Sequence, residues 1–270
     1  MVKLSISRVW DESRETIARD GGLITTVALA LFVLPGTIIG TIEPRLAAGL
    51  LPTGGNSVVS YLGPLFFLVI VVGRLAVVRL ALGGAVSVGE AIRQGAIRTP
   101  VAIAAFIIFL LPFVVLGAPI LLRMLEGGAN PSPLASAGLL LVLIACFALA
   151  MRLVLLVFPI ALADRLGPFA ILKRSWDLTQ GNWWRLIAFV FLFFCASVIA
   201  SRATAWVVGS ALTLTVGAIE PLTIGAMLFA LALTVVGAIF AVLFSVMLAR
   251  IYVQLTGDTA AEASVPTSGS

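Results

Sequence analysis

The 270-residue sequence contains no histidine, two cysteines and few charged side chains. Charged residues make up 11% of the chain, against about 25% in an ordinary soluble domain. Cys146 and Cys195 lie inside apolar runs without metal-ligand spacing, which argues against zinc sites and disulfide frameworks. Paired carboxylates of the general acid/base type are also missing, as are recognisable nucleophile and metal sets. We therefore expect no enzymatic activity and no cofactor.

Apolar residues dominate instead, at 61% of the chain. About 20 consecutive apolar residues cross the roughly 30 Å hydrocarbon core as a helix. The runs that meet this measure form three pairs, at about 21–42 and 58–82, 100–122 and 134–163, and 184–208 and 222–255. The sequence predicts an all-α fold, a polytopic transmembrane helical bundle of about six spans within one domain at 1–255. Residues 256–270 are small and polar and are expected to form a disordered cytoplasmic tail.

The net charge of +5 comes from basic residues placed between the apolar runs. A nucleic-acid binder carries such residues as a patch on a polar face, so we expect anionic membrane lipids as partners and no nucleic acid. Fourteen of the 17 Lys and Arg residues fall on the side of the membrane that holds the amino terminus, and Arg45, Arg123 and Arg202 fall on the opposite side. Because cytoplasmic flanks hold the excess of Lys and Arg, both termini are predicted to be cytoplasmic.

The three pairs of spans share one plan, in which an amphipathic segment leads into an outward helix, a turn and a returning helix. Its echoes are Arg8-Val9-Trp10-Asp11 with Arg174-Ser175-Trp176-Asp177, Ile42-Glu43-Pro44 with Ile219-Glu220-Pro221, and the arginines at 74, 152 and 250. We predict three repeats of amphipathic helix plus transmembrane hairpin, at about 1–82, 83–163 and 164–255. The amphipathic segments, such as Phe169, Leu172, Trp176 and Thr179 on one helix face, are expected to lie in the inner headgroup layer.

Arg74, Arg152 and Arg250 stand near the inner ends of the returning helices. A charge inside hydrocarbon costs several kcal/mol, so each arginine needs an explanation. One interpretation is that all three extend to lipid phosphates at the inner boundary. The other is that the pseudo-symmetry brings them together as a cationic ring that holds an anionic headgroup or substrate. The sequence leaves both open.

The segment from Lys173 to Arg185 is the most distinctive in the chain. Gly181 can adopt the left-handed conformation that ends a helix, and Asn182 can cap the next one, which predicts a sharp corner. Trp183 and Trp184 then fall at headgroup level. The full interfacial motif is Trp176, Asp177, Gly181, Asn182, Trp183 and Trp184. A purely structural corner and a lipid-headgroup site of Lys173, Arg174 and Arg185 are alternative interpretations.

This segment resembles the membrane-domain family of glycerophosphoryl diester phosphodiesterases. The resemblance rests on Arg174-Ser175-Trp176-Asp177-Leu178-Thr179, Gly181-Asn182 and Trp184-Arg185, and continues weakly into Ser87-Val88-Gly89-Glu90-Ala91-Ile92. In that family the membrane region is joined to a soluble phosphodiesterase barrel in some proteins and stands alone in many bacterial membrane proteins. The barrel uses histidines with metal-binding carboxylates, whereas this chain has no histidine. The resemblance therefore implies a membrane module without hydrolase activity.

The expected function is that of a non-enzymatic module of the bacterial inner membrane, which binds lipid or organises a membrane assembly. The alternative is a small transporter or channel, for lipid or another amphipathic substrate. Transporters typically place polar groups near the midplane at broken helices, whereas the middles of these spans are almost wholly aliphatic or Phe. Gly36 and Gly40 form a G-x-x-x-G pattern that predicts close helix packing, within the bundle or with a homo-oligomer or membrane-protein partner.

Overall fold

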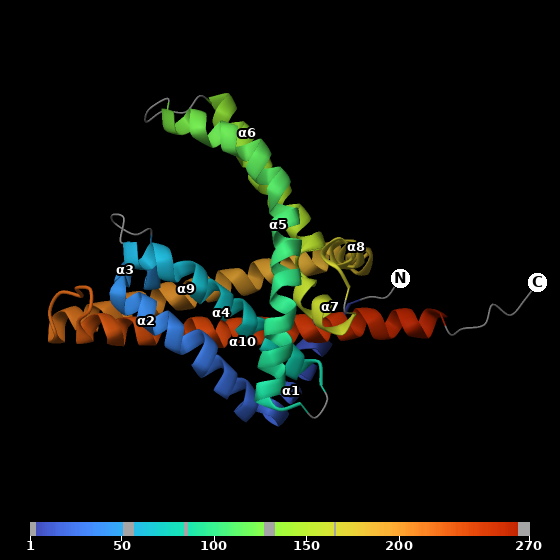
Figure 1. Cartoon of the computed structure of the whole chain (residues 1–270), viewed down its shortest axis with the longest axis horizontal. Helices are drawn as coiled ribbons and strands as arrows, with labels where there is room; N and C mark the ends of the chain where they lie inside the picture. The colour runs from blue at the N-terminus through green and yellow to red at the C-terminus, as the bar shows by residue number, and fades with distance from the viewer. Residues whose placement is uncertain (1–3, 51–56, 84–85, 127–132, 165, 264–270) are drawn as a thin grey trace, which may run out of the picture. The chain divides into compact units, whose positions relative to one another are not determined.

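The computed structural model describes residues 4–50, 57–83, 86–126, 133–164 and 166–263 (Figure 1). Every element of regular structure in these ranges is a helix, which confirms the expected all-α class. The elements are α1 Ile6–Ala28, the π-helix η1 Leu29–Val33, α2 Leu34–Ile42, α3 Pro44–Ala47, α4 Ser57–Ala81, α5 Val88–Glu126, α6 Pro133–Leu153, α7 Val157–Ala163, α8 Pro168–Thr179, α9 Trp183–Thr215 and α10 Ile224–Ala263.

Five helical segments in the described ranges are long and apolar enough to cross a membrane. They are Ile6–Ile42, Tyr61–Ala81, Val88–Val115, Trp183–Thr215 and Ile224–Gly257. A shorter apolar helix, Ser136–Ala150, lies within α6. These segments coincide with the six apolar runs of the sequence, so the expected layout of about six spans is confirmed at this level.

Two boundaries differ from expectation. The fourth run, expected as one span over 134–163, is interrupted by a turn at Val154–Leu156, and α7 follows as a separate helix of 7 residues. At the carboxyl end α10 continues to Ala263, so the first eight residues of the expected disordered tail at 256–270 are helical. The last seven residues of that tail, 264–270, lie outside the described residues.

The three amphipathic segments also differ from one another. The first, at the start of α1, runs without interruption through η1 and α2, and the second is continuous with the rest of α5. The third forms its own helix, α8, because Gly181 with φ +82° turns the chain before α9 begins. A separate surface helix is therefore present in one of the three expected places.

The chain divides into two compact units that cut across the expected repeats. The first unit is built from Pro100–Ile187, with Leu4 and the part of α10 from Gln254 onward. The second unit combines Ser5–Thr99 with Ala188–Val253. The threefold repeat stays a prediction. Within the second unit, residues that flank two of the matching tripeptides are hydrogen-bonded, because the Leu222 amide donates to the Thr41 carbonyl at 2.8 Å.

In the second unit α9 and α10 run alongside each other, as Figure 1 shows, with Phe189 stacked on Phe244. Helix α2 approaches α10 closely through the predicted G-x-x-x-G pattern. A Cβ on Gly36 would lie 2.6 Å from Thr234 Cγ2, and one on Gly40 would lie 2.7 Å from Ala230 Cβ. No side chain larger than hydrogen fits at these crossings, so the pattern packs helices within the chain.

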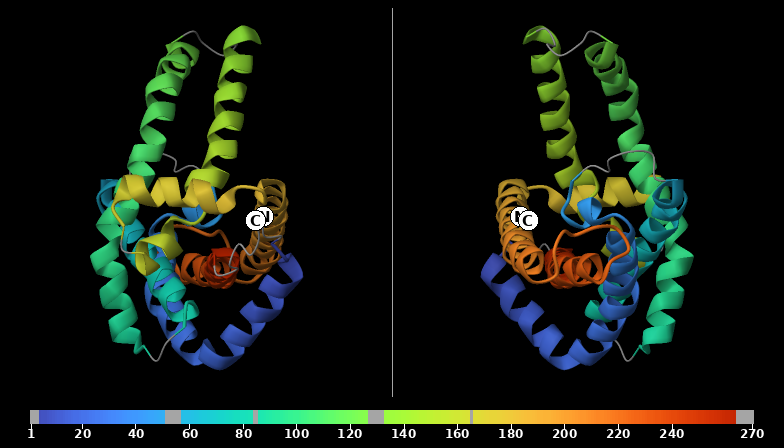
Figure 2. Two further views of the ribbon diagram at one scale, coloured as in Figure 1. Left: turned by 90° about the vertical axis from the view of Figure 1, so that its right-hand side faces the viewer. Right: turned by 90° about the vertical axis from the view of Figure 1, so that its left-hand side faces the viewer.

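In the first unit the far half of α5 and α6 run next to each other as a hairpin, visible as two green ribbons in both panels of Figure 2. The ideal Cβ position of Gly117 lies 3.8 Å from Val142 Cγ1. Helix α8 packs against both α6 and α7. In Figure 2 α8, in yellow, crosses the direction of α6, and this crossing positions the site described next.

Candidate functional site

The end of α6 is fastened to α8 through the backbone of Arg152. The last carbonyls of a helix lack intrahelical partners and must find others. The Ser175 hydroxyl donates to the Arg152 carbonyl at 2.8 Å, and the Thr179 hydroxyl reaches the same oxygen at 3.4 Å. Ser175 and Thr179 are fully buried and stand one turn apart on α8. These two hydroxyls complete the end of α6 and allow the chain to turn into α7.

The Arg152 side chain, from α6, stacks on a tryptophan of α8, the helix that also binds its carbonyl. Its Cζ lies 3.6 Å from the centroid of Trp176 and 6.0 Å from that of Trp183, which is the geometry of a cation–π contact. Two buried donors in this group have no partner among the described residues, Arg152 Nε and Trp183 Nε1. Both atoms are donors, so a ligand that satisfied them would have to accept hydrogen bonds.

Gly181 makes the predicted corner between α8 and α9. Its φ of +82° lies in the left-handed region that favours glycine. The Asn182 carbonyl accepts from the Leu186 amide at 3.1 Å, as expected of the residue that opens a helix. Its side-chain Oδ1 accepts from the Leu4 amide at 3.0 Å, and Arg185 Nη1 donates to the Leu4 carbonyl at 2.8 Å. The corner therefore turns the chain from α8 into α9 and also binds Leu4 near the amino terminus.

The charged residues of the motif have different surroundings. Arg174 pairs with Asp164 at 3.7 Å, which joins α8 to the turn after α7, and both groups are partly exposed. Lys173 and Asp177 are exposed on α8, and Arg185 is exposed on α9. Trp184 is 75% exposed, and its ring lies 5.1 Å from that of Trp183. Lys173, Trp184 and Arg185 are therefore exposed on the surface of α8 and α9.

The buried face of α8 differs from the predicted stripe. Leu172 and Thr179 are buried as expected, but Phe169 is 72% exposed and Trp176 is half-buried. The buried residues are Ile171, Leu172, Ser175, Leu178 and Thr179. The stripe is rotated because Ser175 and Thr179 turn toward the α6 carbonyl, whereas the prediction had placed Phe169 and Trp176 on the same face as Leu172 and Thr179.

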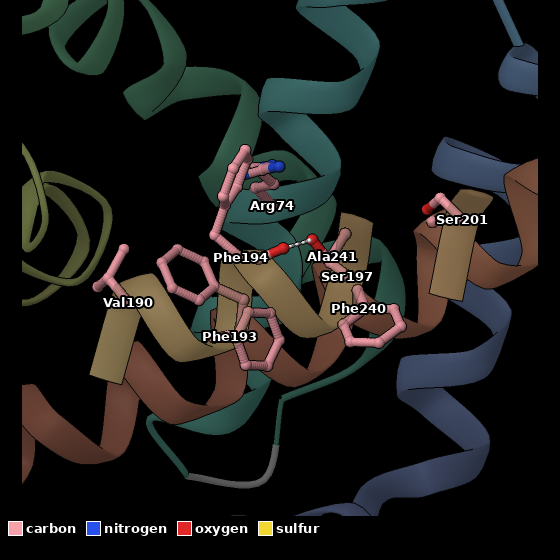
Figure 3. Close-up of a pocket in the computed structure, with 10 residues that line it drawn as sticks. Arg74, Val190, Phe193, Phe194, Ser197, Ser201, Phe240 and Ala241 are labelled. Carbon is pink, nitrogen blue, oxygen red and sulfur yellow. Dashed lines mark hydrogen bonds between the residues drawn. The ribbon is translucent and has the colours of Figure 1, made fainter. Parts of the chain in front are cut away.

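The other two arginines of the predicted trio lie in the second unit, in unlike surroundings. Arg250 Nη2 donates to the Ala81 carbonyl at 2.8 Å, so it completes the end of α4, while its buried Nε has no partner among the described residues. Arg74 enters a pocket from α4, lined by Phe193, Phe194, Ser197 and Ser201 of α9 and by Phe240 of α10 (Figure 3). The cationic ring stays a prediction.

Sequence reasoning missed three partners of the site: Leu4, Ser175 and Thr179. Each acts across a long sequence separation, or through a backbone group whose partner lies on another helix. The only signal in the sequence was the spacing of Ser175 and Thr179 by one helical turn. Within the described ranges, no three Cys, Asp or Glu side chains come together as metal ligands.

A family comparison matches residues 131–266, half of the chain, to the membrane domain of glycerophosphoryl diester phosphodiesterase. The chain belongs to this membrane-domain family. No curated protein and no solved structure matches the chain. Together with the apolar helices, the match shows that this membrane domain is an integral, multi-pass membrane protein.

The matched segment contains the whole corner, with Arg152, Trp176, Gly181 and Trp183. Arg74 lies outside it, as do α1 to α5. The family match therefore covers the corner, and of the Arg74 pocket it covers the lining residues from α9 and α10 but not Arg74 itself.

Proposed function

We propose that this protein is a non-enzymatic, lipid-binding module of the bacterial inner membrane. Its contact to anionic headgroups is the corner formed by the end of α6, α8 and the start of α9. The observation that carries the proposal is the pair of buried donors without partners, Arg152 Nε and Trp183 Nε1, beside a guanidinium stacked on Trp176.

A phosphate headgroup has the chemistry that this corner lacks. Each buried donor left unsatisfied costs about 1–3 kcal/mol, and an anionic oxygen accepts from both a guanidinium and an indole. The exposed Lys173 and Arg185 add positive charge around the site. Each Lys or Arg near an anionic membrane surface contributes about 1 kcal/mol of attraction. The exposed Trp184 has the amphipathic ring that prefers the headgroup level.

The proposed orientation places the corner at the cytoplasmic face. Fourteen of the 17 basic residues support a cytoplasmic amino terminus. Two single cysteines test this, in a background with Cys146 and Cys195 replaced by Ala: Ser87→Cys before α5 and Ala218→Cys after α9, both at exposed positions. An impermeant maleimide should label Ala218→Cys in intact cells, and Ser87→Cys only after permeabilisation. The reverse pattern would contradict the orientation.

The binding proposal is tested with two neighbouring tryptophans. Trp183→Phe removes the partnerless Nε1 donor and keeps an aromatic ring, whereas Trp184→Phe changes an exposed ring and serves as the matched control. A ligand that binds only the folded state raises its stability in proportion to its binding. Phosphatidylglycerol added to the detergent-purified protein should raise the melting temperature of the parent and of Trp184→Phe, and raise it less for Trp183→Phe.

Phosphatidylcholine provides the second control in that experiment. It has a phosphate but no net charge, so it should stabilise the parent less than phosphatidylglycerol does. Equal stabilisation by the two lipids, or an equal response of the two tryptophan variants, would refute a headgroup site at the corner.

A second candidate function, the movement of a lipid or another amphipathic substrate, is favoured by the pocket at Arg74. The test is lipid flipping in vesicles reconstituted with the protein, followed by dithionite quenching of a fluorescent phosphatidylglycerol. Protein-dependent loss of the protected fluorescence would support transport, and loss equal to that of protein-free vesicles would leave binding as the function.

A further inference from the structure

Arg74 lies deep in its helix. It stands seven residues before the end of the candidate span Tyr61–Ala81, about 10 Å along the helix axis at 1.5 Å per residue. Arg79, five residues further on, already occupies the end of α4, where Nη1 donates to the Gly83 carbonyl at 3.0 Å and Nε to Gln94 at 2.6 Å. Arg74 is therefore not the residue that marks the end of this span.

The surroundings of Arg74 are almost entirely apolar. Its pocket, of about 290 Å³, lies between α4, α9 and α10 (Figure 3). The lining residues include the rings of Phe193, Phe194, Phe240 and Phe244. The only other polar side chains on the wall are the hydroxyls of Ser197 and Ser201, and the Ser197 hydroxyl donates to its own helix at the Phe194 carbonyl, 2.9 Å away.

None of the described residues that line this pocket carries a charge opposite to the Arg74 guanidinium. Among the residues that the structure describes, none accepts a hydrogen bond from it or forms an ion pair with it. An arginine near the centre of a span is unfavourable by several kcal/mol and is normally paired or in contact with water. The pocket wall supplies neither a carboxylate nor a free carbonyl for this purpose. The missing element is an anion, which a guanidinium binds through two parallel hydrogen bonds.

The pocket continues into apolar space. A second pocket, of about 390 Å³, shares Ser201, Gly237 and Ala241 with it and is otherwise lined mainly by aliphatic and aromatic residues of α2, α4 and α10. Gly237 stands where the two pockets meet, and a Cβ added there would have no atom within 4 Å. Glycines elsewhere on the same wall differ, since Gly36 and Gly40 are in tight contact with α10. Gly237 therefore leaves open space between the two pockets, whereas Gly36 and Gly40 allow close packing of helices.

We infer that the Arg74 pocket binds the singly charged anionic headgroup of a membrane amphiphile, a carboxylate or a phosphate, whose hydrocarbon chain occupies the adjoining apolar pocket. One cation with two hydroxyls suits one small anion, and a polar ligand without a chain would leave the aromatic and aliphatic wall unfilled. This site shares no residue with the corner of α6, α8 and α9. It therefore goes beyond the proposed headgroup site and specifies the ligand class of the pocket on which the second candidate function rests.

The test uses the full chain in phosphatidylcholine nanodiscs that carry a trace of one photoactivatable probe. The three probes are phosphatidylglycerol, palmitate and phosphatidylcholine, each with a diazirine on the hydrocarbon chain. After irradiation, peptide mass spectrometry should place the anionic probe on the α9 and α10 residues that line the two pockets. Labelling by phosphatidylglycerol identifies a phospholipid, and labelling by palmitate identifies a carboxylate as the bound anion.

Arg74→Leu should reduce this labelling about tenfold or more, because a charge-assisted hydrogen bond is lost. Arg74→Lys should retain part of it, since the charge remains. Arg45→Leu removes an exposed arginine of the same unit and should leave the labelling unchanged. Trp183→Phe should also leave it unchanged, which separates this site from the one at the corner.

Gly237→Leu provides a variant that keeps Arg74 and fills the junction of the two pockets. It should reduce labelling several-fold, while Gly63→Leu, at another glycine with no atom within 4 Å of an added Cβ, should not. Melting temperatures check that each variant is folded, and the glycine pair carries the test if Arg74→Leu does not fold. Equal labelling by the phosphatidylcholine probe, or labelling that survives both Arg74→Leu and Gly237→Leu, would overturn the inference.

Discussion

Arg152 and Arg74 occupy comparable places in the expected repeats, and the protein treats them differently. Arg152 is held from both ends, since Ser175 and Thr179 bind its carbonyl and Trp176 lies under its guanidinium. Arg74 reaches an aromatic pocket in which none of the described residues pairs with it. The first arginine contacts a corner of the fold, whereas the second has no partner among the described residues that would account for its presence.

The comparison shows that comparable places in the expected repeats do not give two arginines the same surroundings. The contacts of each arginine depend on the helix that packs opposite it. Helix α8 brings a tryptophan ring under the Arg152 guanidinium and two hydroxyls to its carbonyl. Helix α9 also brings two hydroxyls, Ser197 and Ser201, to the Arg74 pocket, but none of the described residues forms a hydrogen bond or ion pair with the guanidinium there. The carbonyl and the ring face of the first are held by residues of the chain, whereas our proposal for the second is a partner from the bilayer.

The largest expected effect is that replacing the two arginines by leucine changes the free energy of unfolding in opposite directions. Arg152→Leu removes a desolvated cation–π contact and should lower the free energy of unfolding by roughly 2 kcal/mol. Arg74→Leu removes an unpaired charge from an apolar pocket and should raise it, by up to about 2.5 kcal/mol, in detergent without anionic lipid. Thermal unfolding of both variants in the same detergent measures the difference. Destabilisation of similar size by both would break the comparison.

A smaller effect is expected at the corner itself. Gly181→Ala places a side chain on a residue with φ +82°, which costs roughly 1–2 kcal/mol. Gly167→Ala is the matched control, because Gly167 precedes α8 with φ −76° and a Cβ there would have no atom within 4 Å. The melting temperature should fall for the first variant and stay close to the parent value for the second. Equal melting temperatures would show that the left-handed turn is not required.

The smallest effect is expected at the ion pair of the corner. Asp164→Asn removes the charge opposite Arg174, at 3.7 Å and partly exposed. Pairs of this kind contribute about 0–1 kcal/mol, so unfolding should change by less than 1 kcal/mol and the change should shrink at high salt. A larger, salt-independent loss would mean that Arg174, and not Arg152, holds the corner together.

The spans and the corner could be predicted from the sequence because each depends on residues that are close together along the chain. Twenty apolar residues determine a crossing helix by themselves, and Gly181 followed by Asn182 determines a turn by itself. The G-x-x-x-G at Gly36 and Gly40 was likewise sufficient to predict a close helix approach, which the contacts with Thr234 and Ala230 confirm.

The parts that could not be predicted depend on partners far apart in the sequence. The break after Leu153 carries no Gly or Pro at Val154–Leu156. The Arg152 carbonyl at this break is satisfied by the Ser175 hydroxyl, 23 residues further along the chain. Asn182 and Arg185 form hydrogen bonds with the backbone of Leu4, which lies 178 and 181 residues away from them in the sequence. Apolar periodicity gives no sign of such contacts, because the groups that meet are hydroxyls, amides and carbonyls.

Native mass spectrometry of the protein released from membranes rich in phosphatidylglycerol tests the lipid-binding corner most directly. The parent and Trp184→Phe should retain the same number of tightly bound phosphatidylglycerol molecules, and Trp183→Phe should retain one fewer. Retention of the same number of anionic lipids by all three proteins would contradict the account.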